Sequence, residues 1–235
     1  MSGISAIGFD LDGTLLDHRA ASGEALAHLV HAWGASPSPA LERAWWELER
    51  RHLAPWRAGL IGFDEQRRRR VRDFLPMVVG ADEERGDAEL DAMFSVYLSA
   101  YEAAWCMYAE ADAVLTAVRA AGLPVGLLTN GATEQQERKL AAVGIRDRFD
   151  VVCMSEAIGA AKPDAAAFAA LCSGLGVPPA EVLFVGDDYG ADILGGRAAG
   201  LQTYFVNRGD READAAGDAP APGHPDLLGL LRLLP

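Results

Sequence analysis

Two aspartates at the end of a hydrophobic segment are the first residues in this chain that could do chemistry. Residues 4–9 are mostly apolar and lead into Asp10-Leu11-Asp12-Gly13, where the glycine permits a sharp turn. Side chains two positions apart on a strand point to the same side, so both carboxylates can face one pocket. Close carboxylates repel one another unless a cation lies between them. The pair suggests a metal site, a nucleophile beside a general acid or base, or both, and an Asp-rich turn is the plain alternative.

Three further polar clusters follow hydrophobic segments that are expected to be strands. In chain order they are Thr129-Asn130-Gly131, then Lys162-Pro163, and then Gly186-Asp187-Asp188 with Asp192. In a parallel sheet, ligands bind beyond the carboxyl ends of the strands. Each cluster lies where such an architecture would place a site, and this coincidence is more informative than any cluster alone.

The elements that would carry these clusters alternate along the chain. Strands are predicted at residues 4–10, 124–129, 149–154, 182–185 and 203–206. Helices are predicted at residues 111–121, 133–143, 163–175 and 191–199, with a capping box from Thr133 to Gln136 and Pro163 as a first helical residue. Apolar strands that alternate with helices indicate an α/β fold with a Rossmann-like, doubly wound parallel sheet.

Residues 18–105 have a different character and are predicted to form an inserted all-helical domain. Apolar residues recur at three-to-four spacing in residues 24–33, 39–52, 64–74 and 88–105. All five tryptophans lie here and are expected mainly to form its core, whereas the arginine run 67–70 is expected on a solvated face near acidic neighbours. Residues 1–17 and 106–235 would form the other domain, with a loose loop at 208–226.

Composition narrows the class of protein. A formal net charge of −13 argues against nucleic acid and against an anionic membrane surface as partners. No apolar run approaches the roughly 18 residues that span a bilayer. The three cysteines form no CxxC pair, and the N-terminus lacks the layout of a secretion signal. We expect a cytoplasmic protein that is a monomer or a weak homodimer.

The four ordered clusters resemble the motifs of the haloacid dehalogenase (HAD) superfamily. The nucleophile motif would be Asp10-Leu11-Asp12-Gly13-Thr14, and the later clusters match the second, third and fourth motifs in order. The helical insert resembles the C1 cap of this family. Among its subgroups, the chain is most similar to the 5′-nucleotidase and N-acylneuraminate-9-phosphatase branch.

This resemblance implies a Mg²⁺-dependent phosphatase that hydrolyses a small phosphorylated metabolite through an aspartyl-phosphate. Asp10 would be the nucleophile and Asp12 the general acid and base, and Lys162 would offset negative charge. The phosphoryl group would be bound by Thr129, the backbone N–H of Asn130 and Lys162. Mg²⁺ would be held by Asp10, by the carboxylate of Asp187 and by the backbone carbonyl of Asp12. Asp188 and Asp192 would lie next to these ligands without binding the metal directly. Asp192 would act through water or by holding Lys162. Asp188 stands where this branch usually has a serine.

Other activities of the superfamily remain to be weighed. A sugar phosphomutase also uses an aspartate at the position of Asp12, and a non-catalytic phosphate-binding relative would keep the fold without turnover. Dehalogenation is disfavoured because family dehalogenases lack the acid at Asp12. Phosphonate hydrolysis is disfavoured because it needs a cap lysine, and residues 18–105 contain none.

Overall fold

The computed structural model describes residues 3–80, 84–209 and 223–235, and it divides into two compact units. Residues 1–17 and 106–235 belong to one unit, and residues 18–105 belong to the other. Most of the loop predicted at 208–226 lies outside the described residues. No helix within the described ranges is long and apolar enough to cross a bilayer.

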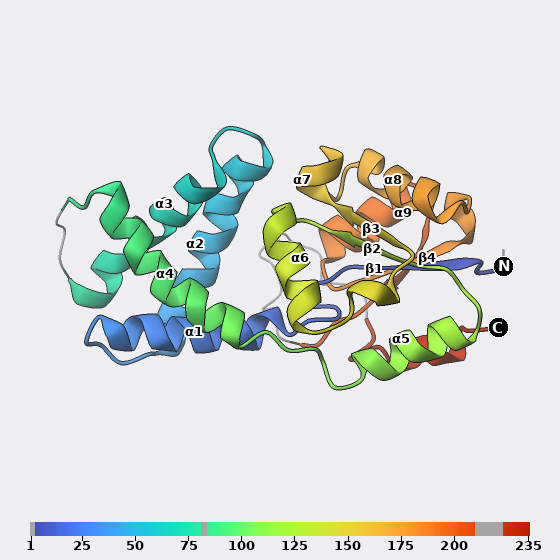
Figure 1. The fold of residues 1–235 in the computed structure, drawn as a ribbon, viewed down its shortest axis with the longest axis horizontal. Helices are drawn as coiled ribbons and strands as arrows, with labels where there is room; N and C mark the ends of the chain where they lie inside the picture. Colours follow the sequence, from blue (N-terminus) through green and yellow to red (C-terminus); the bar gives the residue numbers. More distant parts are fainter. Residues whose placement is uncertain (1–2, 81–83, 210–222) are drawn as a thin grey trace. The chain divides into compact units, whose positions relative to one another are not determined.

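The unit that contains both chain ends is built on a parallel sheet. The strands found in its described residues are β1 (Ala6–Phe9), β2 (Val125–Thr129), β3 (Val151–Met154), β4 (Val182–Gly186) and β5 (Gln202–Phe205). Their order is β3-β2-β1-β4-β5, and every adjacent pair is parallel. Figure 1 shows β1 inside this sheet with helices on both sides. The predicted Rossmann-like α/β class is therefore confirmed, and each predicted strand is present.

Helices cover the two faces of this sheet. They are α5 (Ala111–Ala120), α6 (Thr133–Ala142), α7 (Ser155–Ile158), α8 (Ala165–Leu175) and α9 (Gly195–Ala198), with shorter turns η1 (Arg146–Arg148), η2 (Pro179–Glu181), η3 (Tyr189–Leu194) and η4 (Leu228–Arg232). Ile7 and Phe9 of β1 share a buried cluster with α5, α6 and η4. Ala6 shares a second buried cluster with α8. Alternating side chains of β1 thus pack on opposite layers, as strand geometry requires.

Three details of the predicted helix starts are wrong. Thr133 opens no capping box; its backbone N–H donates to Glu156 Oε2 of α7 at 2.8 Å instead. Helix α8 begins at Ala165 rather than at Pro163, because the Asp164 carboxylate caps it by accepting from the N–H of Ala166. The helix predicted at 191–199 is two elements, since η3 is a π-helical turn that leads into α9.

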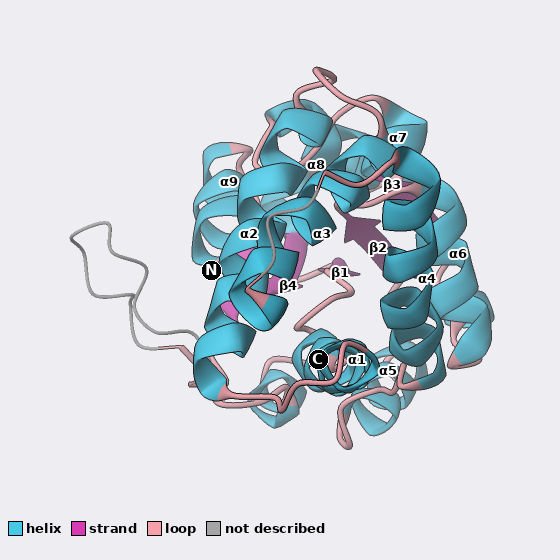
Figure 2. Cartoon of the chain, turned by 90° about the vertical axis from the view of Figure 1, so that its left-hand side faces the viewer, coloured by secondary structure: helices cyan, strands magenta, loops and turns pink. Residues whose placement is uncertain are grey.

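The second unit consists of helices and loops in its described residues, as Figure 2 shows in cyan and pink. Its helices are α1 (His18–Ala32), α2 (Pro39–Arg57), α3 (Phe63–Val79) and α4 (Asp87–Ala103). Trp45 is fully buried between the rings of Phe74 and Tyr97, which lie 4.9 and 4.8 Å from it. Trp33, Trp46 and Trp105 are partly buried against the same cluster, whereas Trp56 lies outside it against Phe63.

The arginine run only partly occupies the solvated face that the sequence predicts. Arg68 and Arg69 pair with acidic neighbours on the helix surface. The prediction is wrong for Arg70, which is 3% exposed. Its guanidinium lies 4.0 Å from the centre of the Trp45 ring and pairs with Glu49 at 2.9 Å. Burial raises the pKa of Glu49, but Arg70 and His18 outweigh it and leave that pKa well below its ordinary value.

The two segments that connect residues 18–105 to the first unit are joined to each other by backbone hydrogen bonds. The N–H of Asp17 donates to the carbonyl of Cys106 at 3.0 Å, and the N–H of Tyr108 donates to the carbonyl of Leu15 at 3.0 Å. Leu16 and Met107 form an antiparallel bridge between them. The ends of the inserted segment are therefore held side by side by the first unit itself.

Candidate active site

Three strand ends bring the predicted site residues together. Asp10 follows β1 directly, Thr129 is the last residue of β2, and Asp187 follows β4 directly. Because β1 pairs with both β2 and β4, these three residues lie at adjacent positions along one edge of the sheet. Gly13 has a φ of 88°, which a residue with a Cβ rarely adopts, so it provides the predicted turn after the two aspartates.

A buried ion cluster lies at this edge. The Nζ of Lys162 is 2.5 Å from Asp10 Oδ1 and 2.8 Å from Asp192 Oδ1, and all three residues are buried. Burial alone would lower the pKa of Lys162, but the two carboxylates outweigh it and raise that pKa above its ordinary value. Lys162 is therefore an ammonium that is shared between two carboxylates.

The backbone of Lys162 is held as firmly as its side chain. The Asn130 side-chain amide donates to the carbonyl of Lys162 at 2.8 Å and accepts from its N–H at 2.8 Å. This reciprocal pair ties the loop after β2 to the segment before α8. The side chain of Asn130 is thus a structural link, which leaves its backbone N–H as the part predicted to bind a phosphoryl group.

The carboxylates at this edge provide a set of oxygen ligands. Asp10, Asp187 and Asp192 each offer an oxygen, and these atoms all lie within 4.8 Å of one another. The hydroxyl of Thr14 lies 3.4 Å from both Asp10 and Asp187. Burial raises the pKa of Asp192 even though Lys162 lowers it. Three carboxylates share this cluster with the ammonium of Lys162, so its negative charge exceeds what that ammonium balances. The donor set therefore fits a hard divalent cation such as Mg²⁺.

The carboxylate of Asp12 contacts two side chains of α6. It lies outside the three-carboxylate set and contacts Lys139 Nζ at 2.7 and 2.8 Å and Gln136 Nε2 at 3.1 Å. The sequence reasoning assigned neither Gln136 nor Lys139 to the site. The available signal was their three-residue spacing on the helix that follows Thr129, together with the scarcity of lysine in the chain.

Asp188 and Asp192 accept backbone hydrogen bonds within the turn after β4. Asp188 Oδ1 accepts from the N–H of Ala191 at 2.9 Å, which caps η3. Asp192 Oδ2 accepts from the N–H of Asp188 at 2.9 Å while its other oxygen faces Lys162. Asp192 therefore holds Lys162, one of its two predicted roles, and Asp188 orders the loop that carries Asp187.

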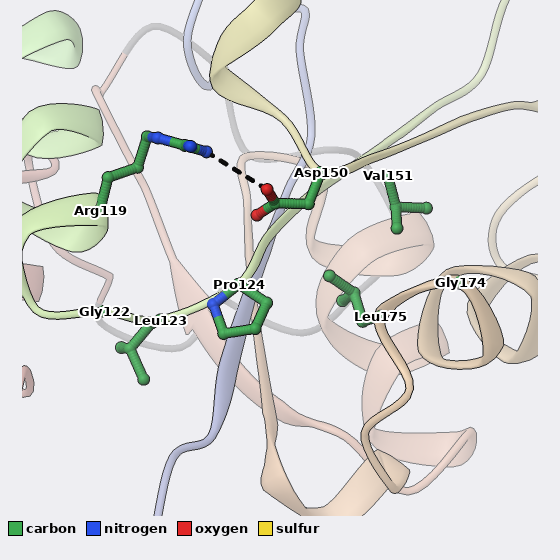
Figure 3. A pocket seen from close by; sticks show the side chains of 8 residues that line it. All are labelled: Arg119, Gly122, Leu123, Pro124, Asp150, Val151, Gly174 and Leu175. Atoms are coloured by element: carbon green, nitrogen blue, oxygen red, sulfur yellow. Dashed lines mark hydrogen bonds and ion pairs between the residues drawn. The ribbon is translucent and has the colours of Figure 1, made fainter.

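A hollow of about 480 Å³ lies at the opposite end of the sheet. It is lined by residues that precede β2 and begin β3, among them Pro124 and Val151, and by an ion pair of 3.5 Å between Arg119 and Asp150, as Figure 3 shows. None of the predicted site residues lines it. The hollow is therefore separate from the site at the carboxyl ends of the strands.

Comparison with known proteins agrees with this geometry. The family model of haloacid dehalogenase-like hydrolases matches residues 4–200. The chain belongs to this family. That span includes β1 to β4, α6 and every residue of the ion cluster, so the resemblance seen in the four motifs is confirmed at the level of the family.

Individual relatives of the family match over different lengths. Phosphoserine phosphatase from Thermus thermophilus is 39% identical over 108 residues, which are 46% of this chain and 43% of that protein. Phosphoglycolate phosphatase from Yersinia pseudotuberculosis is 29% identical over 248 residues, which cover 98% and 94% of the two chains. The chain spans about half the length of the curated relatives that it matches first.

A solved structure has the same fold over almost the whole chain. The HAD-hydrolase YfnB from Bacillus subtilis, bound to magnesium, superposes with a TM-score of 0.75 at 22% identity and covers 99% of both chains. At this identity the likeness supports the fold alone.

Proposed function

We propose that this protein is a Mg²⁺-dependent phosphatase that hydrolyses a small phosphorylated metabolite through an aspartyl-phosphate at Asp10. The observation that carries this proposal is the buried cluster of Asp10, Lys162 and Asp192 beside Asp187, at the end of a central strand. A nucleophile, a cation that offsets charge, and oxygen ligands for a metal meet there. The phosphatases among the relatives support the same reaction.

The first chemical step would use Asp10 and Asp12. A carboxylate oxygen of Asp10 attacks phosphorus while the bond from phosphorus to the ester oxygen breaks, which forms the aspartyl-phosphate. Asp12 gives a proton to the departing oxygen, so the product leaves as a neutral alcohol. Thr129, the N–H of Asn130 and Lys162 would bind the phosphoryl oxygens and stabilise their charge.

The second step would regenerate the nucleophile. Asp12, now ionised, takes a proton from a water molecule, whose oxygen attacks phosphorus. The bond from Asp10 to phosphorus breaks, and inorganic phosphate is released. Asp10, Asp187 and the carbonyl of Asp12 would hold Mg²⁺, which would offset the negative charge of the phosphoryl oxygens when bound.

Asp12 also favours this reaction over dehalogenation. L-2-haloacid dehalogenases have the same fold, so the fold alone does not choose between the two activities. A departing halide needs no proton, whereas a departing alkoxide does. The three cysteines form no CxxC pair, and on this ground we place the activity in the cytoplasm.

The remaining domain assignment is part of this proposal. Residues 18–105 would act as the cap that selects the substrate, and the other unit would carry out the chemistry. Membership of the 5′-nucleotidase and N-acylneuraminate-9-phosphatase branch, and a monomer or weak homodimer, stay predictions.

The decisive experiment uses p-nitrophenyl phosphate and a radiolabelled aryl phosphate. The wild-type protein should turn over the ester only with Mg²⁺, and acid quenching should trap label on the protein. Asp10→Asn should lose both turnover and trapped label, because an amide of the same shape is not a nucleophile. Turnover that survives in Asp10→Asn would exclude this nucleophile, and a wild-type protein without turnover would favour a non-catalytic relative.

A further inference from the structure

Helix α6 points two polar side chains at the site, and the proposed reaction assigns work to neither. Gln136 and Lys139 lie three residues apart, so they share one face of the helix. They are 2% and 3% exposed. Lys139 Nζ donates to both carboxylate oxygens of Asp12, at 2.8 and 2.7 Å. Gln136 Nε2 donates to Asp12 Oδ2 at 3.1 Å and to Thr129 Oγ1 at 2.6 Å.

The contacts of Lys139 fix the orientation of the Gln136 amide. An ammonium can only donate, so both oxygens of Asp12 act as acceptors in the ionised form that the structure shows, which precedes the protonated form needed for the first step. The Gln136 atom that faces Asp12 must then be its NH₂ group, because its carbonyl oxygen would face another acceptor. The same nitrogen faces the oxygen of Thr129. The Thr129 hydroxyl therefore accepts from Gln136, and its own proton must point elsewhere.

This arrangement prepares Thr129 for an anion. A hydroxyl has one proton to donate. Since Gln136 uses the oxygen of Thr129 as an acceptor, that proton remains free for a phosphoryl oxygen at the end of β2. One amide therefore orients both the proposed phosphate ligand and the proposed acid.

Gly131 leaves room for this amide. A Cβ built at Gly131 would lie 2.9 Å from Gln136 Cδ and 3.0 Å from Gln136 Nε2. Contacts this short require one group to move. The glycine is therefore needed here for the space beside Gln136, which gives a second, independent way to disturb the arrangement.

We propose that Gln136 and Lys139 are positioning residues: Lys139 and Gln136 fix the carboxylate of Asp12, and Gln136 directs the Thr129 hydroxyl proton toward the transferring phosphoryl group. This inference rests on the proposed function, since it assigns these residues to the same reaction. It goes beyond that function by making α6 a part of the active site.

The role of Lys139 is tested by a double-mutant cycle with Asp12, measured as kcat/KM for phenyl phosphate. Lys139→Met should lower kcat/KM by about 10–100-fold, the range typical of residues that orient the ligands of a metal site. In an Asp12→Asn background the same substitution should change kcat/KM by less than about twofold. If Lys139 acts through the Asp12 carboxylate, its loss has little further effect once that carboxylate is gone, so the two effects are not additive. Lys139→Arg keeps the charge and should retain most of the activity.

A matched control is available on the same helix. Arg138 is exposed and next to Lys139, so Arg138→Met makes a similar change in charge away from the site and should leave kcat/KM unchanged. Equal effects of Lys139→Met in the two Asp12 backgrounds, or an effect no larger than that of Arg138→Met, would overturn the role of Lys139. The Asp12→Asn/Lys139→Met double variant removes both charges of this ion pair, so the cycle stays readable if Lys139→Met alone is unstable.

The role of Gln136 is tested through inhibition by inorganic phosphate. Gln136→Glu nearly keeps the shape but places an acceptor beside Thr129 and Asp12, so it should capture the Thr129 proton and repel Asp12. The inhibition constant of inorganic phosphate should be about 10–100-fold higher for Gln136→Glu than for the wild type. It should also be higher for Gln136→Glu than for Gln136→Met. Gly131→Ala should raise the constant in the same direction. If Gln136→Glu binds phosphate as well as the wild type, or better than Gln136→Met does, the amide has no orienting role.

These outcomes are separable from the proposed function. If the wild-type protein lacks Asp10-dependent turnover, the proposed function fails. If that turnover is present and the Lys139 and Gln136 variants behave like Arg138→Met, the function stands and this inference alone is wrong.

Discussion

Replacing Lys162 by methionine should lower the stability of the protein strongly, although the two side chains have a similar size and shape. The substitution keeps most of the apolar stem but removes the ammonium that Asp10 and Asp192 share. The side chain of Lys162 is 3% exposed and that of Asp192 is 1% exposed, so water cannot replace the lost charge. Removal of one partner from a buried ion pair costs about 3–5 kcal/mol. At about 2–4 °C per kcal/mol for a chain of this size, the melting temperature should fall by about 6–20 °C.

The assay is thermal unfolding in a chelator, followed by a Mg²⁺ titration. Mg²⁺ should raise the melting temperature of Lys162→Met more than that of the wild type, because the freed carboxylates gain a cation in the native state alone. Asp192→Asn is the matched control. It leaves Lys162 paired with Asp10 and disturbs the hydrogen bond from the N–H of Asp188, so it should cost only about 1–3 kcal/mol.

The melting temperatures of Lys162→Met and Asp192→Asn, compared with each other and with the wild type, decide whether Lys162 holds the two carboxylates together. If Lys162→Met melts within about 2 °C of the wild type, or later than Asp192→Asn does, Lys162 does not hold the two carboxylates together. A melting temperature that Mg²⁺ leaves unchanged in both variants would also contradict the view that these carboxylates lie at the metal site.

Three further predictions concern other residues. Asp187→Ala should raise the Mg²⁺ concentration needed for half-maximal turnover, and an unchanged titration would show that Asp187 is not a ligand. Asp12→Ala should lower kcat/KM by about 10²–10⁴-fold for an alkyl phosphate and much less for p-nitrophenyl phosphate, whose leaving group needs no proton; equal losses would exclude an acid role. Arg70→Met should destabilise the helical unit by about 1–3 kcal/mol, because the partly buried Glu49 would lose the guanidinium and keep His18 as its charged partner. Since the folded pKa of Glu49 lies below the unfolded value of 4.5, the stability from this pair is present above pH 4.5 and is lost as the pH falls below it, which acid melting curves of the wild type and Arg70→Met would reveal.

The sequence predicted the part of the site that sheet geometry controls. Asp10, Thr129 and Asp187 each end or follow a hydrophobic segment, and parallel strands bring such ends to one edge. Their convergence needs no knowledge of side-chain contacts, and the same is true of the five strands. The family resemblance added roles to these positions, and those roles remain predictions that the variants above test.

The contacts that the sequence missed depend on which way a helix faces. Gln136 fits a capping box in its local sequence, and the observed position of α6 turns it inward instead. Lys139 follows three residues later and could as well lie on a solvated face. Arg70 is the same case in the other unit, since the neighbouring arginines 67–69 are only partly buried and the packing against Trp45 and Glu49 separates Arg70 from them. Periodicity gives the spacing of such residues but not the surface that each one meets.

The pairing of Asp17 with Cys106 has a consequence for how such a protein can change over time. To the first unit, residues 18–105 are a loop whose two ends are already joined by backbone hydrogen bonds. The entropy of closing a loop grows slowly with its length, so what lies between those ends can be lengthened, shortened or exchanged at little expense in stability. A lineage could therefore acquire a new substrate preference by exchanging one continuous stretch of its gene, while the residues around Asp10 stay as they are.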